Sequence, residues 1–355
     1  MNIIREILLF LFLSIVLYLL FWPVPVDPVI WEAPHSPSLE GNYTPNNYLV
    51  NVERFGLGDG IGPEDIDVDA FGYIYTGYED GEIIRYKPDG SGGERFAHTG
   101  GRPLGLEFDK YGNLIVADAL QGLLSIDPIG KITVLTTGTK DVKFGFADDL
   151  DISPDGTIYF SDASSKTGIT DYRHDIVDHR PYGGLFAYDP QSKRTYLVQD
   201  SMYFANGVAV SPEGDFVLVN ETSEYRVRKV WIKGNMVGKS EILMDGLPGF
   251  PDGISSNGRG IYWIALPSRR QTIIDNLSDN PIMRKVILRL PEAIQPGPQR
   301  YGFVLGIDEE GNVVHNLQDP SPESFSPITS VEEHDGMLYL GSLTYSGFAR
   351  IKAPE

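Results

Sequence analysis

The chain has 355 residues, no cysteine and a formal net charge of −20. This acidic balance argues against a nucleic-acid partner, whose phosphate backbone is bound through Lys and Arg contacts that release counterions. The absence of cysteine excludes disulfides, thiolate zinc sites and cysteine nucleophiles.

Near the N-terminus, residues 7–22 form a nearly unbroken apolar run. With Ile3 and Ile4 the run approaches the roughly 20 residues that a membrane-spanning helix needs. No small-x-small cleavage site follows, since residues 23–28 read PVPVDP. We therefore predict an uncleaved signal-anchor transmembrane helix over residues 1–22 rather than a removed signal peptide. The short N-terminus is expected in the cytoplasm, and the rest of the chain in the periplasm, a lumen or outside the cell.

Residues 23–45 are rich in proline and show little periodicity, which is typical of an extended linker along a domain surface. From residue 46 to residue 355 the pattern changes to short apolar strands separated by turns such as Pro88-Asp89-Gly90. Helical periodicity is nearly absent from this body. We therefore expect one large all-β domain over residues 46–355.

One short motif recurs six times in this body. A residue X precedes a small or acidic residue and an apolar strand start, and a Gly turn follows six to eight residues after X. About 40 to 50 residues form one four-stranded propeller blade, and most intervals between the X positions are close to that length. The sequence thus predicts a six-bladed β-propeller, with these X positions at the starts of its innermost strands: Glu64, Leu104, Asp148, Asn206, Asp252 and Thr329.

The interval between Asp252 and Thr329 is longer than the others. Within it, residues 268–298 have helical spacing of apolar residues, and we expect a helical insertion over one face. Residues 305–308 imitate the motif too close to Thr329 to begin a blade, so they are predicted to be an outer strand of the fifth blade. A strand near residues 48–55 is expected to close the ring, which removes the exposed edges of an open sheet.

Four of the six X residues carry side-chain oxygens. Equivalent positions of a propeller meet at its axis, so these four would converge at the mouth of the central tunnel. Carboxylates and an amide carbonyl suit Ca²⁺, which takes six to eight oxygens and tolerates irregular geometry. The alternative is that the Asp and Asn residues only cap turns. The predicted ligands of one calcium ion are Glu64, Asp148, Asn206 and Asp252.

A cation at this point would polarise a carbonyl or phosphoryl oxygen for hydrolysis. Asp252 or Asp148 could then act as the catalytic base or nucleophile. Asp149 and Asp162 are candidates for supporting those residues. Residues 173–179, RHDIVDH, carry two histidines but no strong zinc pattern; they are predicted to form a solvated loop, with a lid over the tunnel as the alternative.

Several segments resemble the strictosidine synthase-like family, and the resemblance extends from about residue 48 to the end of the chain. The segments that carry it read YFANGVAVSP at 203–212, VNETSEYRV at 219–227, FPDGI at 250–254 and EEHDGMLYLGS at 332–342. The anchor is similar to that of a membrane-associated branch of the family. The resemblance implies a six-bladed propeller related to gluconolactonase and regucalcin, diisopropylfluorophosphatase and paraoxonase.

In those calcium hydrolases the tunnel ion is held by a Glu of the first blade and by Asn or Asp of later blades, which implies Glu64, Asn206 and Asp252 here. They usually carry Asn where this chain has Asp148. The family's condensing enzyme uses a catalytic Glu at the position of Thr329, so a condensation is not expected.

The expected function is a membrane-anchored, calcium-dependent hydrolase with a small-molecule ester or lactone as substrate, including aryl esters. Two alternatives stay open at this point. The first is a non-catalytic membrane-tethered propeller that binds a ligand or protein partner. The second, disfavoured, is a condensing enzyme.

Overall fold

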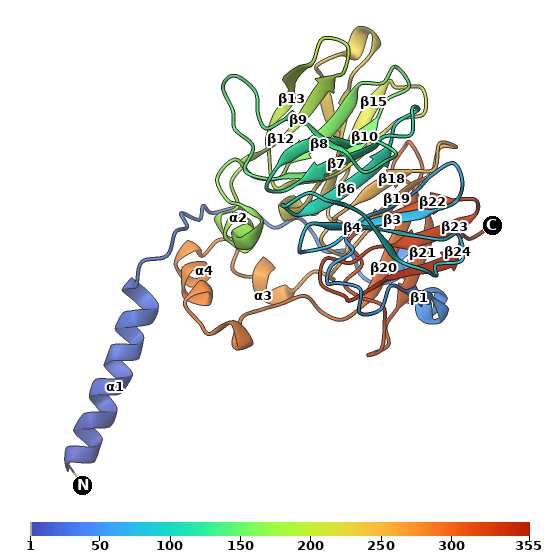
Figure 1. Ribbon diagram of the computed structural model, residues 1–355. Helices are drawn as coiled ribbons and strands as arrows, with labels where there is room; N and C mark the ends of the chain where they lie inside the picture. The colour runs from blue at the N-terminus through green and yellow to red at the C-terminus, as the bar shows by residue number, and fades with distance from the viewer. Residues whose placement is uncertain (1) are drawn as a thin grey trace.

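The computed structural model describes residues 2–355 as a ring of six four-stranded antiparallel sheets with an N-terminal helix outside it (Figure 1). The predicted all-β, six-bladed β-propeller is therefore confirmed. The helix, α1 (Asn2–Phe21), is exposed along its length, and within residues 2–355 only its segment Ile3–Phe21 is long and apolar enough to span a membrane.

The first three blades each use four consecutive strands. The first contains β2 (Ile66–Val68), β3 (Ile74–Gly77), β4 (Glu82–Tyr86) and β5 (Glu94–His98). The second contains β6 (Pro103–Phe108), β7 (Leu114–Asp118), β8 (Gly122–Ile126) and β9 (Ile132–Thr136). The third contains β10 (Ala147–Ile152), β11 (Ile158–Asp162), β12 (Gly183–Asp189) and β13 (Arg194–Met202).

The last three blades complete the ring. The fourth contains β14 (Ala205–Val210), β15 (Phe216–Glu221), β16 (Arg226–Trp231) and β17 (Ser240–Met244). The fifth contains β18 (Ile254–Ser256), β19 (Tyr262–Ala265), β20 (Gly302–Ile307) and β21 (Val313–Asp319). The sixth contains β22 (Val331–His334), β23 (Met337–Leu340), β24 (Phe348–Lys352) and the N-terminal β1 (Glu53–Phe55).

Two predictions about the ends of the ring can be compared with these strands. The ring is closed by β1, which pairs with β24, so the predicted closing strand exists. It is shorter than expected, because Tyr48–Asn51 forms the 3₁₀ turn η2. Residues 305–307 belong to β20, the third strand of the fifth blade, in agreement with their assignment to that blade.

The small or acidic residue after X is explained by the crowding of the innermost strands. Asp65 Oδ2 accepts a hydrogen bond from the Leu106 amide of the second blade at 2.9 Å. Asp149 Oδ2 does the same for Val208 of the fourth blade at 2.8 Å. A Cβ on Gly207 would stand 2.5 Å from the carbonyl oxygen of Asp252, so only glycine permits that approach. These contacts hold successive blades in register around the tunnel.

Apolar side chains fill the space between neighbouring blades. The cluster between the fourth and fifth blades, for example, buries Leu218, Val227, Ile264 and Phe303 completely. Burying such a side chain contributes about 1.5–3 kcal/mol to stability. Apolar clusters between the blades thus surround the acidic tunnel.

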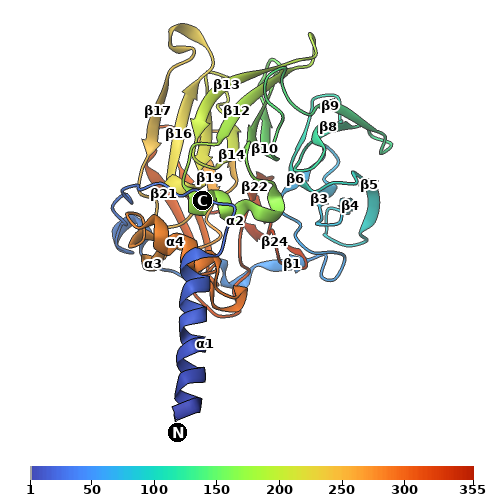
Figure 2. The ribbon, with the colours of Figure 1, turned by 90° about the vertical axis from the view of Figure 1, so that its left-hand side faces the viewer.

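Two insertions cover one end of the tunnel (Figure 2). The third blade contributes η3 (Ile169–Asp171) and α2 (Tyr172–Asp178), and the fifth contributes α3 (Thr272–Asp275), α4 (Pro281–Leu288) and η6 (Glu292–Ile294). The predicted helical insertion at residues 268–298 is therefore present. Short 3₁₀ turns elsewhere are η1 (Gly41–Tyr43), η4 (Thr222–Glu224) and η5 (Gly234–Met236).

The prediction of a solvated loop at residues 173–179 is wrong. The segment is helical, and Asp175, Asp178 and His179 are buried. Asp178 accepts bonds from the distant Asp27 amide and from the Lys166 ammonium, and Asp175 accepts one from the Ser164 hydroxyl. Burial of a charge is tolerated when it is paired as Asp178 is, whereas burial raises the pKa of Asp175 to about 7.

Residues 22–31 cross the same end of the propeller between α2 and α3. The Val29 amide donates to the Asp178 carbonyl at 3.1 Å, and the Trp31 amide donates to the Ser278 carbonyl at 3.2 Å. These bonds join the two insertions through the N-terminal segment. The end of α1 therefore lies beside the covered mouth of the tunnel (Figures 1 and 2).

Candidate functional site

The four oxygen-bearing X residues lie at one end of the tunnel and line one cavity of about 490 Å³. Asp148 and Asn206 lie near the starts of β10 and β14, while Glu64 and Asp252 lie two residues before β2 and β18. Thr329 also lines the cavity, whereas Leu104 does not. The structure thus brings together side chains from four different blades.

Asp252 is held firmly by its neighbours. Its carbonyl oxygen accepts bonds from the Gly207 amide at 3.0 Å and from the Asn220 amide group at 2.6 Å. Its amide donates to the Ala265 carbonyl at 3.0 Å, and the Asn206 side-chain amide donates to its carboxylate. Two blades therefore hold the Asp252 backbone, and the Asn206 side chain orients its carboxylate.

Glu64 is fixed by its backbone but not by its carboxylate. Its carbonyl oxygen accepts bonds from Ser330 Oγ at 2.7 Å and Thr329 Oγ1 at 3.3 Å. Its Oε2 atom is buried and has no hydrogen-bond partner. A buried, unpartnered carboxylate oxygen is costly. Asp118, Asp175 and Asp275 also have one, so what distinguishes Glu64 is that it shares the cavity floor with oxygen side chains from three other blades.

The buried carboxyl groups resist ionisation. Burial, followed by the charge of Asp252, raises the pKa of Glu64 to about 8, with Arg102 acting in the opposite direction. Burial raises the pKa of Asp252 to about 7. Burial, then Glu64 and Asp252, raises the pKa of Asp148 well above its usual value. Three carboxylates at this point repel one another unless a positive charge joins them.

The donor set fits a hard cation such as Ca²⁺, because it offers three carboxyl groups and an amide oxygen. Across residues 2–355, however, no three acidic or histidine side chains are already arranged to hold a metal ion. Asn206 does not present its oxygen either, since it turns its amide nitrogen toward the Asp252 carboxylate. A rotation of the Asn206 amide would present its oxygen instead.

Asp149 and Asp162, which were predicted to support the site residues, accept hydrogen bonds from backbone amides. Asp162 Oδ1 accepts a hydrogen bond from the Phe146 amide at 2.9 Å, which positions the start of β10. Asp149 directs its carboxylate to the Val208 amide and lies deeper in the tunnel than the cavity. Neither residue lines the cavity. They position Asp148 and Asn206 rather than contact a ligand.

The cavity walls are largely apolar. Aromatic side chains lie near the acidic floor, and aliphatic side chains of the insertions lie above it. A mostly apolar pocket with a few convergent polar groups is the usual form of a small-molecule site. The principal wall residues are Phe146, Phe204, Tyr225, Phe250, Ile287 and Leu288.

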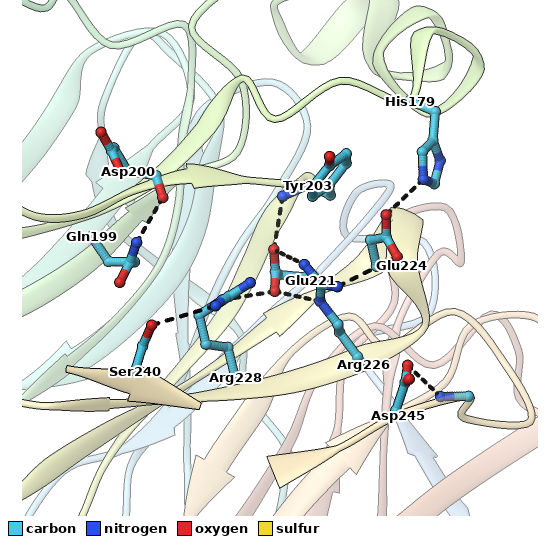
Figure 3. A network of polar contacts seen from close by, with 11 residues as sticks. His179, Gln199, Asp200, Tyr203, Glu221, Glu224, Arg226, Arg228, Ser240 and Asp245 are labelled. Atoms are coloured by element: carbon cyan, nitrogen blue, oxygen red, sulfur yellow. Dashed lines mark hydrogen bonds and ion pairs between the residues drawn. The ribbon is translucent and has the colours of Figure 1, made fainter. Parts of the chain in front are cut away.

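A buried polar network borders this cavity and was not predicted as a functional feature (Figure 3). Glu221 is fully buried and accepts bonds from the Arg226 and Arg228 guanidinium groups at 2.7 and 2.9 Å. His179 Nε2 lies 2.9 Å from Glu224 Oε1. Glu221 and Glu224 both lie in residues 219–227, one of the segments that resemble the family, and this resemblance is the signal that could have identified them.

His179 lines the cavity and holds its covering in place. Its ring stacks on Trp31 of the N-terminal segment with centroids 3.8 Å apart. Burial lowers the pKa of His179, although Glu224 acts in the opposite direction. The pair thus connects α2, the fourth blade and the N-terminal segment at the cavity wall.

Comparison with known proteins identifies the family. The family model described as strictosidine synthase matches residues 148–235, and that of the strictosidine synthase-like N-terminal region matches residues 41–86. The chain is 34% identical over 340 residues to adipocyte plasma membrane-associated protein of Rattus norvegicus, covering 90% of each chain. It is 36% identical over 352 residues to strictosidine synthase-like 6 of Arabidopsis thaliana, covering 96% of this chain and 92% of the relative.

Solved structures share the fold at low sequence identity. A gluconolactonase of Xanthomonas campestris matches with a TM-score of 0.63 and 13% identity, covering 93% of this chain and 97% of that one. Regucalcin of Agrobacterium tumefaciens, described as a calcium-binding protein, matches with a TM-score of 0.58 and 14% identity, covering 85% and 95%. With the two relatives above, which match over nearly their whole length, the chain belongs to the strictosidine synthase-like family.

Proposed function

We propose that this protein is a membrane-anchored, calcium-dependent hydrolase of lactones or aryl esters. The observation that carries the proposal is the tunnel floor, where oxygen side chains from four blades line one cavity and Glu64 Oε2 has no partner. The fold that the chain shares with a gluconolactonase and with a calcium-binding regucalcin also supports a calcium-dependent hydrolase. Propellers of this kind therefore provide a precedent for both the ion and the substrate.

Glu64, Asp148, Asn206 and Asp252 would hold the ion. When bound, calcium would supply polarisation of the substrate's carbonyl oxygen. The Asp252 carboxylate, on a backbone held by Asn220 and Gly207, would take a proton from the attacking water, whose oxygen bonds to the carbonyl carbon. The bond from that carbon to the alkoxy oxygen then breaks, and the leaving oxygen receives the proton. Asp148 is the alternative base, and either carboxylate could instead attack as the nucleophile.

The cavity walls favour such a reaction. Phe146, Phe204 and Phe250 exclude water from the acidic floor and offer an apolar surface to an aryl or alkyl group. Electrostatic interactions strengthen in a site from which water is excluded. The floor and walls thus suit a substrate with one polar carbonyl and a larger apolar part.

The proposal is tested by hydrolysis of phenyl acetate and of a δ-lactone by the full-length protein in detergent. Chelation should abolish turnover, and added Ca²⁺ should restore it. Turnover that is unaffected by chelation would contradict the metal-assisted reaction.

A second candidate is a ligand-binding propeller without catalysis. It is favoured by the hydrogen bond between Asn206 and Asp252, which satisfies two of the four floor residues without any ion. This candidate predicts binding of an apolar ligand without turnover, with or without Ca²⁺. The condensing reaction has no support at the cavity, where Thr329 directs its hydroxyl to the Glu64 carbonyl.

A further inference from the structure

The cavity is covered by a roof, which we define as residues 22–31, α2 and residues 269–300. These segments cover the acidic floor, and the linker hydrogen bonds described above join them. Figure 2 shows the roof on the side of the propeller from which α1 extends. The anchor and the cavity entrance thus share one side of the molecule.

The roof is bound directly to the end of the anchor helix. Arg289, which follows α4 and is buried, donates to the Trp22 carbonyl at 2.6 Å and to the Leu19 carbonyl at 2.8 Å. The last carbonyl groups of a helix lack partners within the helix and carry partial negative charge, so a guanidinium group stabilises them. The end of the predicted membrane span is therefore fixed beside α4.

The outer surface of the roof is apolar. Ile282 on α4 is 63% exposed, and Ile294 on η6 is 65% exposed. Ile30, Ile273 and Met283 are also exposed on the same segments. Several exposed apolar side chains on neighbouring segments beside a membrane anchor indicate an interaction surface, and lipid is the occupant that α1 already brings to this side.

The charge of the roof also differs from that of the rest of the chain. The roof as a whole carries seven Arg and Lys against six Asp and Glu, and residues 269–300 alone carry six against three, whereas the whole chain has a net charge of −20. Since Arg284 and Arg289 are buried and Arg270 pairs with Asp275, the exposed roof is close to neutral. It therefore lacks the negative charge that would repel anionic headgroups, and its exposed apolar side chains can insert at the boundary with the acyl chains.

The helix α4 separates this outer surface from the cavity. Ile287 and Leu288 line the cavity, while Ile282 and Met283 point to the outside. Arg284, which is buried, and Lys285 occupy the rest of its circumference. Apolar residues that line the cavity and apolar residues that are exposed thus lie on the same two turns of α4, next to the end of α1.

We propose that the roof is a membrane-binding surface and that the cavity takes amphiphilic esters or lactones with a long alkyl chain, which enter from the bilayer. The substrate half of this inference rests on the proposed hydrolase function. The polar carbonyl would reach the acidic floor, while the alkyl chain lies between the aromatic walls and α4. Membrane contact by the roof does not depend on any reaction.

Site-directed spin labelling tests the membrane half, because the chain has no cysteine and each introduced one is unique. Ile282→Cys and Ile294→Cys would be labelled in the full chain, reconstituted in phosphatidylcholine vesicles containing phosphatidylserine. Ile129→Cys and Phe71→Cys are matched controls, since their residues are 88% and 83% exposed in turns at the opposite end of the propeller.

Labels at 282 and 294 should collide more with oxygen, which concentrates in lipid, than with a water-soluble nickel chelate, and the control labels should show the reverse. Labels at 282 and 294 that behave like the controls would overturn the proposal. Labels there that are shielded from both reagents would indicate a protein occupant and would overturn it equally.

The substrate half is tested with p-nitrophenyl acetate and p-nitrophenyl palmitate. Ile282→Asp should lower hydrolysis of the vesicle-bound palmitate several-fold and leave hydrolysis of the soluble acetate unchanged. Equal effects on both would refute entry from the bilayer. If neither ester is hydrolysed while the labels contact lipid, the proposed function fails and the membrane surface stands.

Discussion

Acidic side chains at the two ends of the propeller have different surroundings. At the end away from the roof, Asp109 Oδ1 accepts hydrogen bonds from the Tyr111 and Asn113 amides, both at 2.8 Å. Asp69 does the same for Phe71 and Tyr73, both at 2.9 Å. These carboxylates cap turns and are satisfied within a few residues. At the roof end, Glu64 Oε2 is buried without a partner.

The difference concerns carboxylates that converge on one cavity from several blades and carboxylates that cap a local turn. Turn capping, which was the alternative explanation for the X residues, describes the far end well. It does not describe the floor, where Asp148 and Glu64 are buried together and where burial, followed by the charge of Glu64, raises the pKa of Asp148. An acidic residue that costs stability is expected to be retained for a ligand.

The largest expected effect is on the floor. Glu64→Gln should weaken calcium binding and abolish turnover, because the ion loses a charged ligand. Asp252→Asn should abolish turnover even at saturating Ca²⁺ if this residue is also the base or nucleophile. Glu213→Gln, in a turn of the same blade as Asn206, is the control and should retain wild-type rates in an ester hydrolysis assay.

The pH dependence of stability should also distinguish the ends. In the folded protein Glu64 and Asp252 hold their protons up to about pH 8 and pH 7, whereas in the unfolded chain they release them near pH 4. Stability in chelator should therefore fall as the pH rises from about 4 to about 8. Thermal unfolding followed by circular dichroism measures this fall.

Added Ca²⁺ should reverse the trend at the upper end of that range, since the ion binds the ionised carboxylates. If stability in chelator rises with pH instead, the claim that ionised carboxylates on the floor destabilise the metal-free protein is contradicted.

A smaller effect is expected from the far end. Asp109→Ala removes the acceptor of two backbone hydrogen bonds and should destabilise the fold by about 1 kcal/mol. Urea denaturation measures this loss. Turnover of the folded variant should equal that of wild type, and a loss of activity would show that the two ends are coupled.

The smallest expected effect concerns the cavity wall. Glu224→Gln replaces the charged partner of His179 by a neutral one and should loosen the stacking of His179 on Trp31. We expect a rise of a few-fold in KM with little change in kcat, because the residue positions the roof and does not contact the reacting atoms. A loss of kcat without a change in KM would instead indicate that His179 and Glu224 take part in the reaction.

The repeat architecture could be predicted because each innermost strand repeats a local pattern. The residue after X is small or acidic for a reason visible in the register of neighbouring blades, as Gly207 and Asp149 show. The convergence of Glu64, Asp148, Asn206 and Asp252 on one cavity follows from that ring. Which of them contacts an ion stays a prediction.

Only part of the roof could be predicted, since the helical spacing of residues 268–298 indicated that insertion but nothing indicated the burial of α2. Asp178 and His179 are buried because Lys166 pairs with Asp178 and because Asp27 and Glu224 reach them from distant parts of the chain. A local pattern of charged residues, read alone, favours solvent exposure. The role of Trp31 depends likewise on where residues 22–31 cross the propeller.

Calorimetric titration of metal-stripped protein with Ca²⁺ tests the central claim most directly. Wild type is expected to bind one ion, and Glu64→Gln is expected to bind it much more weakly, while Asp109→Asn at the far end should bind it as wild type does. Wild type that binds no Ca²⁺, or a Glu64→Gln variant that binds it equally well, would contradict the metal site and favour the ligand-binding propeller.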